Sequence, residues 1–396
     1  MEKPKVLFIS PQPFFEWRGS PIRVKTNMLA LSEQGYEVDL LTLPIGAEQA
    51  IDNINVIRVW NLLNSKQISI GPSPLKLWFD LLLIIKGLML IRKNSYQVLH
   101  GTEEAGFICY LLSRFNKAKF IFEKHSDSYS YKAKGILKPI LAAYRAVEKF
   151  TIIKSDSVIS TGPALDEQAK KEARVKDESG PSFEKYFVIP DTPSSVEEPS
   201  IEEVDSIKKT LKTSENEVIV GYAGSFASYQ GIDIIFDAIP KIVKENDSIK
   251  FMIVGGSEEE IDRYKNQLKQ QGVTRQIEFL GKIHPDKLPA YLSASDILLA
   301  PRKSGVNSPL KILDYFKAGA AIVATNTQAN QRLLNDENSV LCEFSQDAFA
   351  QSILDLSASP EKRKALGEKA YELYQSTYNF KEFSKQVETV YQRLLN

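Results

Sequence analysis

Short apolar runs alternate with amphipathic segments along the whole chain, and this alternation predicts parallel β-strands joined by helical crossovers. In the first half of the chain the expected strands are residues 5–10, 36–43, 55–60, 96–101, 119–125, 157–161 and 186–191. In the second half they are residues 217–225, 249–256, 277–283, 296–301, 320–325 and 339–344. The pattern indicates two doubly wound α/β domains, in which ligands bind beyond the carboxyl ends of the strands, here in a cleft between the domains.

Helical patterns separate most of these strands, and the first helix has clear end signals. Ser20 is a suitable N-cap, Pro21 suits the first helical position, and Gly35 is expected to end the helix. Further helices are expected at residues 232–244, 309–317 and 348–356. Residues 192–199, TPSSVEEP, are rich in proline, serine and acid and are typical of a linker, so we expect one domain at 1–195 and another from 196 onward.

The longest apolar region, residues 75–91, contains only three charged residues, Lys76, Asp80 and Lys86. At about 100° per residue they fall within one arc of roughly 120° on a helix. Two interpretations stay open: a helix packed on most of its sides, or a helix that touches a membrane surface. Three charges argue against a membrane-spanning helix. The first apolar run of the chain is too short for a signal-peptide core, so we expect a cytoplasmic protein.

The charge balance and the cysteine count argue against two classes of protein. The 396 residues carry 50 Lys and Arg against 50 Asp and Glu, and this neutral balance argues against a dedicated nucleic-acid binder. Two cysteines are too few for a disulfide scaffold. The neutral total conceals an asymmetry, because residues 51–154 contain 16 Lys and Arg but 7 Asp and Glu, a net charge of +9. This stretch includes the apolar region, which suggests docking on an anionic membrane; a solvated basic surface is the alternative.

Several common cofactor sites are not indicated. The sequence lacks G-x-G-x-x-G, the P-loop pattern and Asp-x-Asp, and its three histidines, His100, His125 and His284, do not have the spacing of a zinc site. We therefore expect neither a cofactor nor a metal.

The strongest candidate site lies in residues 296–325, which predict a strand, a loop, a helix beginning at Ser308 or Pro309, and a second strand. A helix N-terminus together with Arg302, Lys303 and Lys311 suits a diphosphate. Asp314 is placed to accept hydrogen bonds from a ribose diol. The alternative is a solvated helix that carries ordinary surface charges.

This stretch also carries a family resemblance. Residues 308–325, SPLKILDYFKAGAAIVAT, resemble S-P-L-K-x-x-E-x-x-A-x-G-x-P-V-V-A-T, a form of the nucleotide-sugar motif of retaining glycosyltransferases with the GT-B fold, family 4 (group 1). Residues 218–238, 251–256 and 278–299 resemble further blocks of that family, in the family order. The resemblance implies a donor domain at 196–378 and a C-terminal helix at 379–396 that crosses back to the first domain.

The resemblance also implies roles for individual residues. Asp314 stands at the position of a ribose-binding glutamate, Lys282 and Ile283 where the base is held, and His125 on the acceptor side near the transferred sugar. The donor-binding set is Gly19, Ser20, Gly224, Ser225, Lys282, Ile283, Arg302, Lys303, Asn307, Ser308, Pro309, Leu310, Lys311 and Asp314.

The acceptor side has further candidates. Glu103 and Glu104 follow the strand at 96–101, where one of them would orient an acceptor or act as a base; an exposed acidic loop is the alternative. For His125 the alternative is a hydrogen-bonded histidine of the core.

The sequence departs from the family at four points. Ser225 and Gln230 stand where the family has a phosphate-binding arginine and lysine, Val306 replaces the first motif glutamate, and Asp314 is one methylene shorter than the second. Either Arg302, Lys303 or Lys311 replaces the lost cations, which we favour, or the protein is a weak or inactive relative.

The expected function is metal-independent transfer of a hexose, with retention, from a UDP-hexose such as UDP-glucose to an acceptor in envelope or extracellular polysaccharide synthesis. The acceptor is expected to be a sugar or a lipid-linked sugar. A UDP-sugar 2-epimerase and a non-catalytic nucleotide-binding relative are the alternatives.

Overall fold

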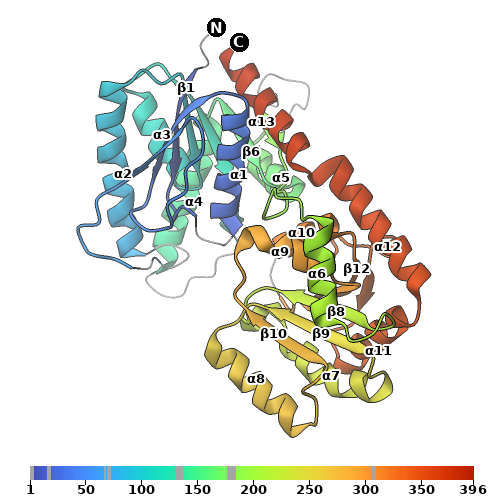
Figure 1. The fold of residues 1–396 in the computed structure, drawn as a ribbon. Helices are drawn as coiled ribbons and strands as arrows, with labels where there is room; N and C mark the ends of the chain where they lie inside the picture. Colours follow the sequence, from blue (N-terminus) through green and yellow to red (C-terminus); the bar gives the residue numbers. More distant parts are fainter. Residues whose placement is uncertain are drawn as a thin grey trace. The chain divides into compact units, whose positions relative to one another are not determined.

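The chain folds into two compact units, each built around its own parallel sheet (Figure 1). The structure is a computed structural model that describes residues 4–15, 19–66, 68, 73–129, 137–175, 184–304 and 309–396. The first unit comprises Met1–Asp191 and Phe380–Asn396, and the second comprises Thr192–Asn379.

The first unit contains a seven-stranded sheet in the order β3-β2-β1-β4-β5-β6-β7, with every pair parallel. Its strands are β1 (Lys5–Ser10), β2 (Glu37–Thr42), β3 (Ile54–Arg58), β4 (Val98–Thr102), β5 (Lys119–Lys124), β6 (Ser157–Ser160) and β7 (Tyr186–Val188). The central strands are buried on both faces, which explains their nearly continuous apolar sequence.

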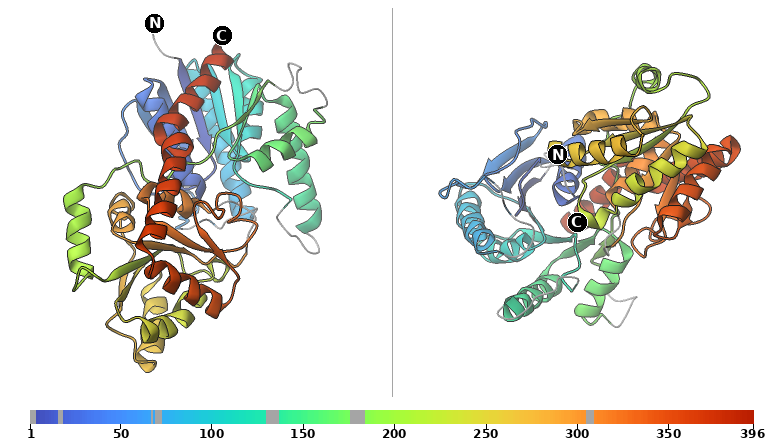
Figure 2. Two further views of the ribbon diagram at one scale, coloured as in Figure 1. Left: turned by 90° about the vertical axis from the view of Figure 1, so that its right-hand side faces the viewer. Right: turned by 90° about the horizontal axis from the view of Figure 1, so that it is seen from below.

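Helices cover both faces of this sheet. They are α1 (Gly19–Glu33), α2 (Pro74–Lys93), α3 (Ala105–Ser113), α4 (Leu137–Lys154), α5 (Pro163–Glu172) and α13 (Phe380–Leu395). The core on one face is formed with α1 and α13, and α2 and α3 contribute to the core on the other. The C-terminal helix α13 thus belongs to the first unit, where it packs against α1 (Figure 2).

The second unit contains a six-stranded parallel sheet in the order β10-β9-β8-β11-β12-β13. Its strands are β8 (Val218–Ala223), β9 (Ile249–Val254), β10 (Ile277–Gly281), β11 (Ile297–Ala300), β12 (Ala321–Thr325) and β13 (Val340–Cys342). Its helices are α6 (Ile201–Leu211), α7 (Asp233–Glu245), α8 (Glu258–Gln270), α9 (Leu288–Ser293), α10 (Leu310–Ala318), α11 (Gln346–Ser357) and α12 (Pro360–Leu373). Three short turns, η1 (Ser228–Gln230), η2 (Pro285–Lys287) and η3 (Tyr374–Tyr378), complete the unit.

The predicted fold class is confirmed, and each of the thirteen expected strands is present with its ends shifted by at most three residues. Two helix starts were predicted wrongly. Ser20 lies inside α1, which already begins at Gly19, so it is not the N-cap. Pro309 is the N-cap of α10 rather than part of its first turn, because its ψ of 119° is extended and helical geometry starts at Leu310.

The helix predicted from the apolar region, α2, is not packed on most of its sides. Its buried residues are Phe79, Leu82, Leu83 and Gly87, whereas Leu77 and Leu81 on the opposite side are 65% and 47% exposed. Among the described residues, we find no helix with the combination of length and apolar character that crossing a bilayer requires.

Candidate functional site

The carboxyl edge of the second sheet carries a buried cation at the start of α10. The Lys311 Nζ has no hydrogen-bond partner among the described residues and lies 4.2 Å from the centre of the Tyr222 ring. A Cβ placed on Gly224 would come within 2.6 Å of this Nζ, so the lysine lies directly against the backbone that follows β8. A free cation beside a helix N-terminus favours the binding of an anion.

Two glycines make this close approach possible. Gly224 has a φ of +151° and Gly255, after β9, a φ of +114°, and a Cβ on Gly255 would lie 2.0 Å from the Gly224 carbonyl oxygen. Larger residues would push the β8 and β9 loops apart. The Tyr222 hydroxyl donates to the Ser225 carbonyl at 2.8 Å and holds the β8 loop in place.

Tyr315 fixes α10 to the sheet. Its buried hydroxyl donates to the Leu299 carbonyl of β11 at 3.0 Å and accepts the Ala223 N–H of β8 at 3.3 Å. This pair of bonds places the first turn of α10, and therefore Lys311, at the ends of two central strands.

Burial is the main influence on the charge of Lys311. The pKa of Lys311 is lowered to about 7, first by burial and then by the neighbouring Arg302, while Asp314 acts in the opposite direction. An anion bound beside Nζ would favour the protonated form. The lysine is therefore able to gain a proton when an anion binds near neutral pH.

Arg302 and Lys303 follow β11 at the same edge. Arg302 Nε donates to the Ser304 carbonyl at 2.9 Å, and the Thr325 hydroxyl donates to the Arg302 carbonyl at 2.6 Å. The Lys303 Nζ lies 5.7 Å from the centre of the Phe344 ring. The charge of Arg302 acts on Lys311, and five of the nine α10 residues are buried, so a simple solvated helix does not describe this element.

Asp314 is engaged by the chain segment that precedes α6. Its Oδ1 accepts both the N–H and the hydroxyl of Ser194, each at 2.7 Å. Burial raises the pKa of Asp314 to about 6, although the two bonds from Ser194 act in the other direction. One oxygen of the carboxylate predicted to bind ribose is thus already used by the protein.

Lys317, one turn further along α10, holds the same segment. Its Nζ donates to the Ser195 carbonyl at 3.2 Å and the Glu197 carbonyl at 2.5 Å, and it lies 3.3 Å from the Glu198 carboxylate. The segment expected to be a linker is therefore bound along α10 from Ser194 onward.

The other predicted donor residues are spread over both units. Lys282 and Ile283 follow β10, whose last carbonyl, that of Gly281, accepts the Gly255 N–H at 2.7 Å and so brings these residues to the same edge. Gly19 and Ser20 form the start of α1 in the first unit. Asn307 and Ser308, like Val306, lie outside the described residues.

A buried polar cluster in the first unit centres on Glu123 of β5. Its Oε1 accepts Arg23 Nε at 2.8 Å, and its Oε2 accepts the Asn27 amide at 2.9 Å. The Nε2 atoms of His100 and His125 lie 3.2 and 3.4 Å from the same Oε2. Two histidines distant in sequence therefore meet at one carboxylate.

The C-terminal helix α13 closes this cluster. The Tyr391 hydroxyl is hydrogen-bonded to His100 Nδ1 at 2.8 Å, and the Arg23 guanidinium lies 4.6 Å from the Phe383 ring centre. Arg23 also donates to the carbonyls of Ile189 and Pro190, just after β7. The cluster thus ties β4, β5, α1 and α13 together.

The two histidines differ in their charge preference. Burial alone lowers the pKa of both rings; for His125, the Glu123 carboxylate more than compensates and raises the pKa above its ordinary value. The pKa of His100 stays lowered. Burial alone would raise the pKa of Glu123, but Arg23 and His125 hold it well below its usual range.

Glu103 supports His125 from the end of β4. Glu103 has a φ of +51°, is 7% exposed, and accepts the His125 N–H at 2.9 Å. Glu104 is ion-paired with Lys76 of α2. An exposed acidic loop therefore does not describe these two residues. The His125 side chain is buried beside the Glu123 carboxylate, and its Nδ1 has no hydrogen-bond partner among the described residues.

Sequence reasoning missed Glu123, Ser194 and Tyr222. A signal existed for Glu123, because a carboxylate inside the buried strand FIFEK needs a partner; the contacts of the other two residues depend on tertiary packing. Among the described residues, no group of three or more His, Cys, Asp and Glu side chains is placed to hold a metal ion.

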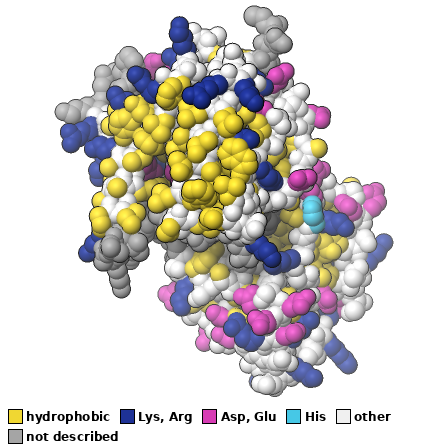
Figure 3. Space-filling view, turned by 90° about the vertical axis from the view of Figure 1, so that its left-hand side faces the viewer, with side chains coloured by type: hydrophobic (Ala, Val, Ile, Leu, Met, Phe, Trp, Pro, Cys, Tyr) yellow, Lys and Arg dark blue, Asp and Glu magenta, His cyan; other side chains and the backbone are white. Residues whose placement is uncertain are grey.

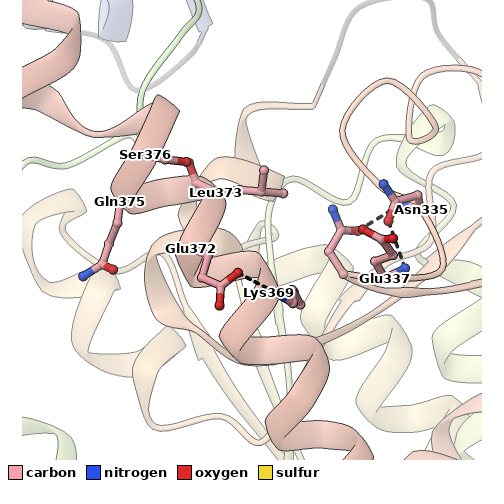
Figure 4. A pocket seen from close by; sticks show the side chains of 8 residues that line it. Asn335, Glu337, Lys369, Glu372, Leu373, Gln375 and Ser376 are labelled. Carbon is pink, nitrogen blue, oxygen red and sulfur yellow. Dashed lines mark hydrogen bonds and ion pairs between the residues drawn. The ribbon is translucent and has the colours of Figure 1, made fainter.

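A separate open cavity of about 650 Å³ lies in the second unit (Figure 4). It is lined by the turn around Asn335 and Glu337 and by the end of α12, where Lys369 pairs with Glu372. Its lining residues come from the segment between β12 and β13, from α12 and from η3, and none of them is Arg302, Lys303 or Lys311.

Two Rossmann-like α/β units, each built around its own parallel sheet, are the architecture of GT-B glycosyltransferases. The family model for Glycosyl transferases group 1 matches residues 203–373, and the model for Glycosyltransferase Family 4 matches residues 17–179. The chain belongs to this glycosyltransferase family, as the resemblance predicted.

Individual proteins agree with this assignment. An uncharacterized glycosyltransferase of Methanocaldococcus jannaschii is 25% identical over 295 residues, which are 74% of this chain and 72% of the relative. Sucrose-phosphate synthase from Thermosynechococcus elongatus has a TM-score of 0.75 at 20% identity and 99% coverage of both chains. Anabaena HepE in complex with UDP and glucose has a TM-score of 0.72 at 14% identity, covering 98% of this chain and 100% of HepE.

Proposed function

We propose that this protein transfers a hexosyl group, with retained anomeric configuration, from a UDP-hexose such as UDP-glucose. The observation that carries the proposal is the buried Lys311 ammonium, which has no partner among the described residues at the start of α10. It lies beside the β8 loop, where Ser225 replaces the expected arginine, and so supplies positive charge that the loop lacks. The HepE complex supports the same donor class.

The diphosphate accepts hydrogen bonds from Lys311 and from free amides at the start of α10, while Arg302 and Lys303 add positive charge. Negative charge grows on the leaving phosphate as its bond to the anomeric carbon breaks. These cations therefore stabilise the transition state more than the bound donor, without a metal ion.

The acceptor hydroxyl approaches on the same face as the leaving phosphate. The new bond from its oxygen to the anomeric carbon forms while the phosphate bond breaks, and a phosphate oxygen takes the hydroxyl proton. His125 donates a hydrogen bond to the transferred hexose as an imidazolium, the form that Glu123 favours. Glu103 is a positioning residue, because its carboxylate already holds the His125 backbone.

We further propose a sugar or lipid-linked sugar as the acceptor, in envelope or extracellular polysaccharide synthesis. The enzyme then works on the cytoplasmic side of the cell membrane. The net charge of +9 in residues 51–154 supports this placement.

The experiment incubates the protein with UDP-glucose and other UDP-hexoses in the presence of EDTA, then measures free UDP and the identity of the sugar. UDP release supports the proposal. An altered sugar still joined to UDP would instead identify a 2-epimerase, and binding without any turnover would identify a non-catalytic relative. Ser194 occupies one Asp314 oxygen, which leaves this edge short of the carboxylates that an epimerase needs.

A further inference from the structure

We propose that the outward sides of α2 and α4, with the end of α3 between them, form a surface that docks on an anionic lipid bilayer. We call this surface the α2–α4 face. The inference deepens the membrane placement proposed above by naming the surface, and its test measures lipid binding rather than sugar transfer. Apolar side chains gather over this part of the first unit, with Lys and Arg at the margins (Figure 3).

The exposed side of α2 is an apolar stripe. Residues at every fourth position point outward along its length, and their side chains are 40–65% exposed: Leu77, Leu81, Ile85 and Met89. Positions four apart lie on one side of a helix, so the four side chains form a continuous row. A helix on the surface of a water-soluble protein normally presents polar residues there.

The two charges in the first half of α2 are directed inward instead. Lys76 is ion-paired with Glu104 at the start of α3, and its side chain is 18% exposed. Asp80 lies beside this pair, and its burial raises its pKa to about 7. In this half of the helix the charged side chains contact the protein, while Leu77 and Leu81 face outward.

The same inversion occurs in α4, which neighbours α3. Its inward Glu148 is ion-paired with the fully buried Lys124, while Ile140, Val147, Phe150 and Ile153 are 36–47% exposed. Tyr110 of α3 contacts Phe150 with ring centres 4.9 Å apart. At the end of α3, Phe115 is 70% exposed and extends the apolar area between the two helices.

Exposed charge around this area is almost entirely positive. Within the described part of residues 51–154, the exposed cations are Lys66, Arg92, Lys93, Arg114, Lys117, Lys119, Lys138 and Lys154. Only Asp52 is an exposed acid in the described part of this stretch. Eight exposed cations against one exposed acid give a net charge of +7 for the described part of this stretch, so most of its positive charge lies on the surface.

An anionic bilayer is the occupant that fits both properties. Its acyl region accepts the leucine and isoleucine side chains, and its phosphates attract the surrounding lysines and arginines. A second copy of the chain would place two basic margins against each other. A nucleic acid would meet the apolar rows with its charged backbone.

The test is sedimentation of the full-length protein with vesicles of phosphatidylcholine alone or mixed with phosphatidylglycerol, at low and high salt. We expect binding to the mixed vesicles only, weakened by salt. The variant Leu77→Ser with Leu81→Ser should reduce the partition coefficient by roughly tenfold or more, since each leucine loses its burial in lipid. Ile201→Ser in the second unit, where the side chain is 76% exposed, is the matched control and should bind as the wild type does.

Trp60 provides a second measurement. Its side chain is 39% exposed, and Lys86 of α2 lies 4.7 Å from its ring. Brominated lipids should quench the tryptophan fluorescence of Trp60 and of Trp78 in α2, and Trp60→Phe should reduce that quenching.

Three results would overturn the inference. They are failure of the wild type to bind anionic vesicles at low salt, unchanged binding of the double-serine variant, and a concentration-dependent dimer that this variant abolishes. Release of UDP from a water-soluble donor is measured in parallel, so loss of lipid binding with unchanged UDP release separates this inference from the proposed reaction.

Discussion

The Lys311 ammonium lies 4.2 Å from the centre of the Tyr222 ring and donates no hydrogen bond to a described residue. Contact with an aromatic face offsets only part of the cost of burying a cation. Lys311 therefore lowers the stability of the second unit in the absence of ligand, and an anion bound beside its Nζ would offset this cost.

Replacement of Lys311 by methionine should stabilise the protein without ligand. The substitution preserves side-chain length and removes the buried charge, so we expect the free energy of unfolding to rise by about 1–3 kcal/mol. Urea denaturation measures the change, with Lys364→Met at a 78% exposed side chain as control. Lower stability of Lys311→Met would show that the lysine has a structural partner.

The same lysine predicts a dependence of stability on pH. Its pKa is about 7 when folded and 10.5 in the reference state, so between these values the unfolded chain binds more protons. This group's contribution to the free energy of unfolding therefore rises with pH from about 7 to 10.5. The rise should be absent from Lys311→Met; an identical pH profile in both proteins would contradict a lowered pKa.

The two bonds from Ser194 to Asp314 should support the second unit. We expect Asp314→Ala to lower the free energy of unfolding by about 1–3 kcal/mol, because it leaves the Ser194 N–H and hydroxyl without their acceptor. Ser194→Ala, which removes one bond, should cost about 1 kcal/mol. Asp336→Ala, at an exposed position, is the control. Equal losses for Asp314→Ala and the control would mean that these bonds contribute nothing.

The two histidines beside the Glu123 carboxylate should have pKa values shifted in opposite directions. The pKa of His125 is raised above 6.5 and that of His100 is lowered below it, and NMR of the ring protons can follow both. Because the folded pKa of His125 is raised, its stabilising contribution is fully present below pH 6.5 and is lost as the pH rises through the folded value. His125→Gln should remove that loss, and titration of both rings on the same side of 6.5 would refute the assignment.

Periodicity made the sheets predictable. The central strands of both units are buried on two faces, so their apolar runs stand out from the sequence between them, and Gly35, with a φ of +73°, ends α1 as expected. The predicted helix starts were less accurate, because neighbouring residues such as Gly19 and Ser20 are both suitable for the N-cap position.

Contacts of the site depended on packing that one sequence does not reveal. Ser194 and Asp314 are 120 residues apart, and His100 and Tyr391 are 291 apart. The inward direction of Lys76 and Asp80 also contradicts the usual assumption that charges mark the solvent side of a helix. This inward orientation depends on Glu104 at the start of α3, which pairs with Lys76 only in the folded protein.

The most direct test of the central claim is isothermal titration of UDP into the wild type and Lys311→Met, both in EDTA. We predict that the wild type binds UDP without a metal and that affinity falls by about 10- to 100-fold in the variant, which lacks a charged hydrogen bond to the diphosphate. Lys364→Met should bind as the wild type does. Absence of UDP binding, or equal affinity of the wild type and Lys311→Met, would contradict the account.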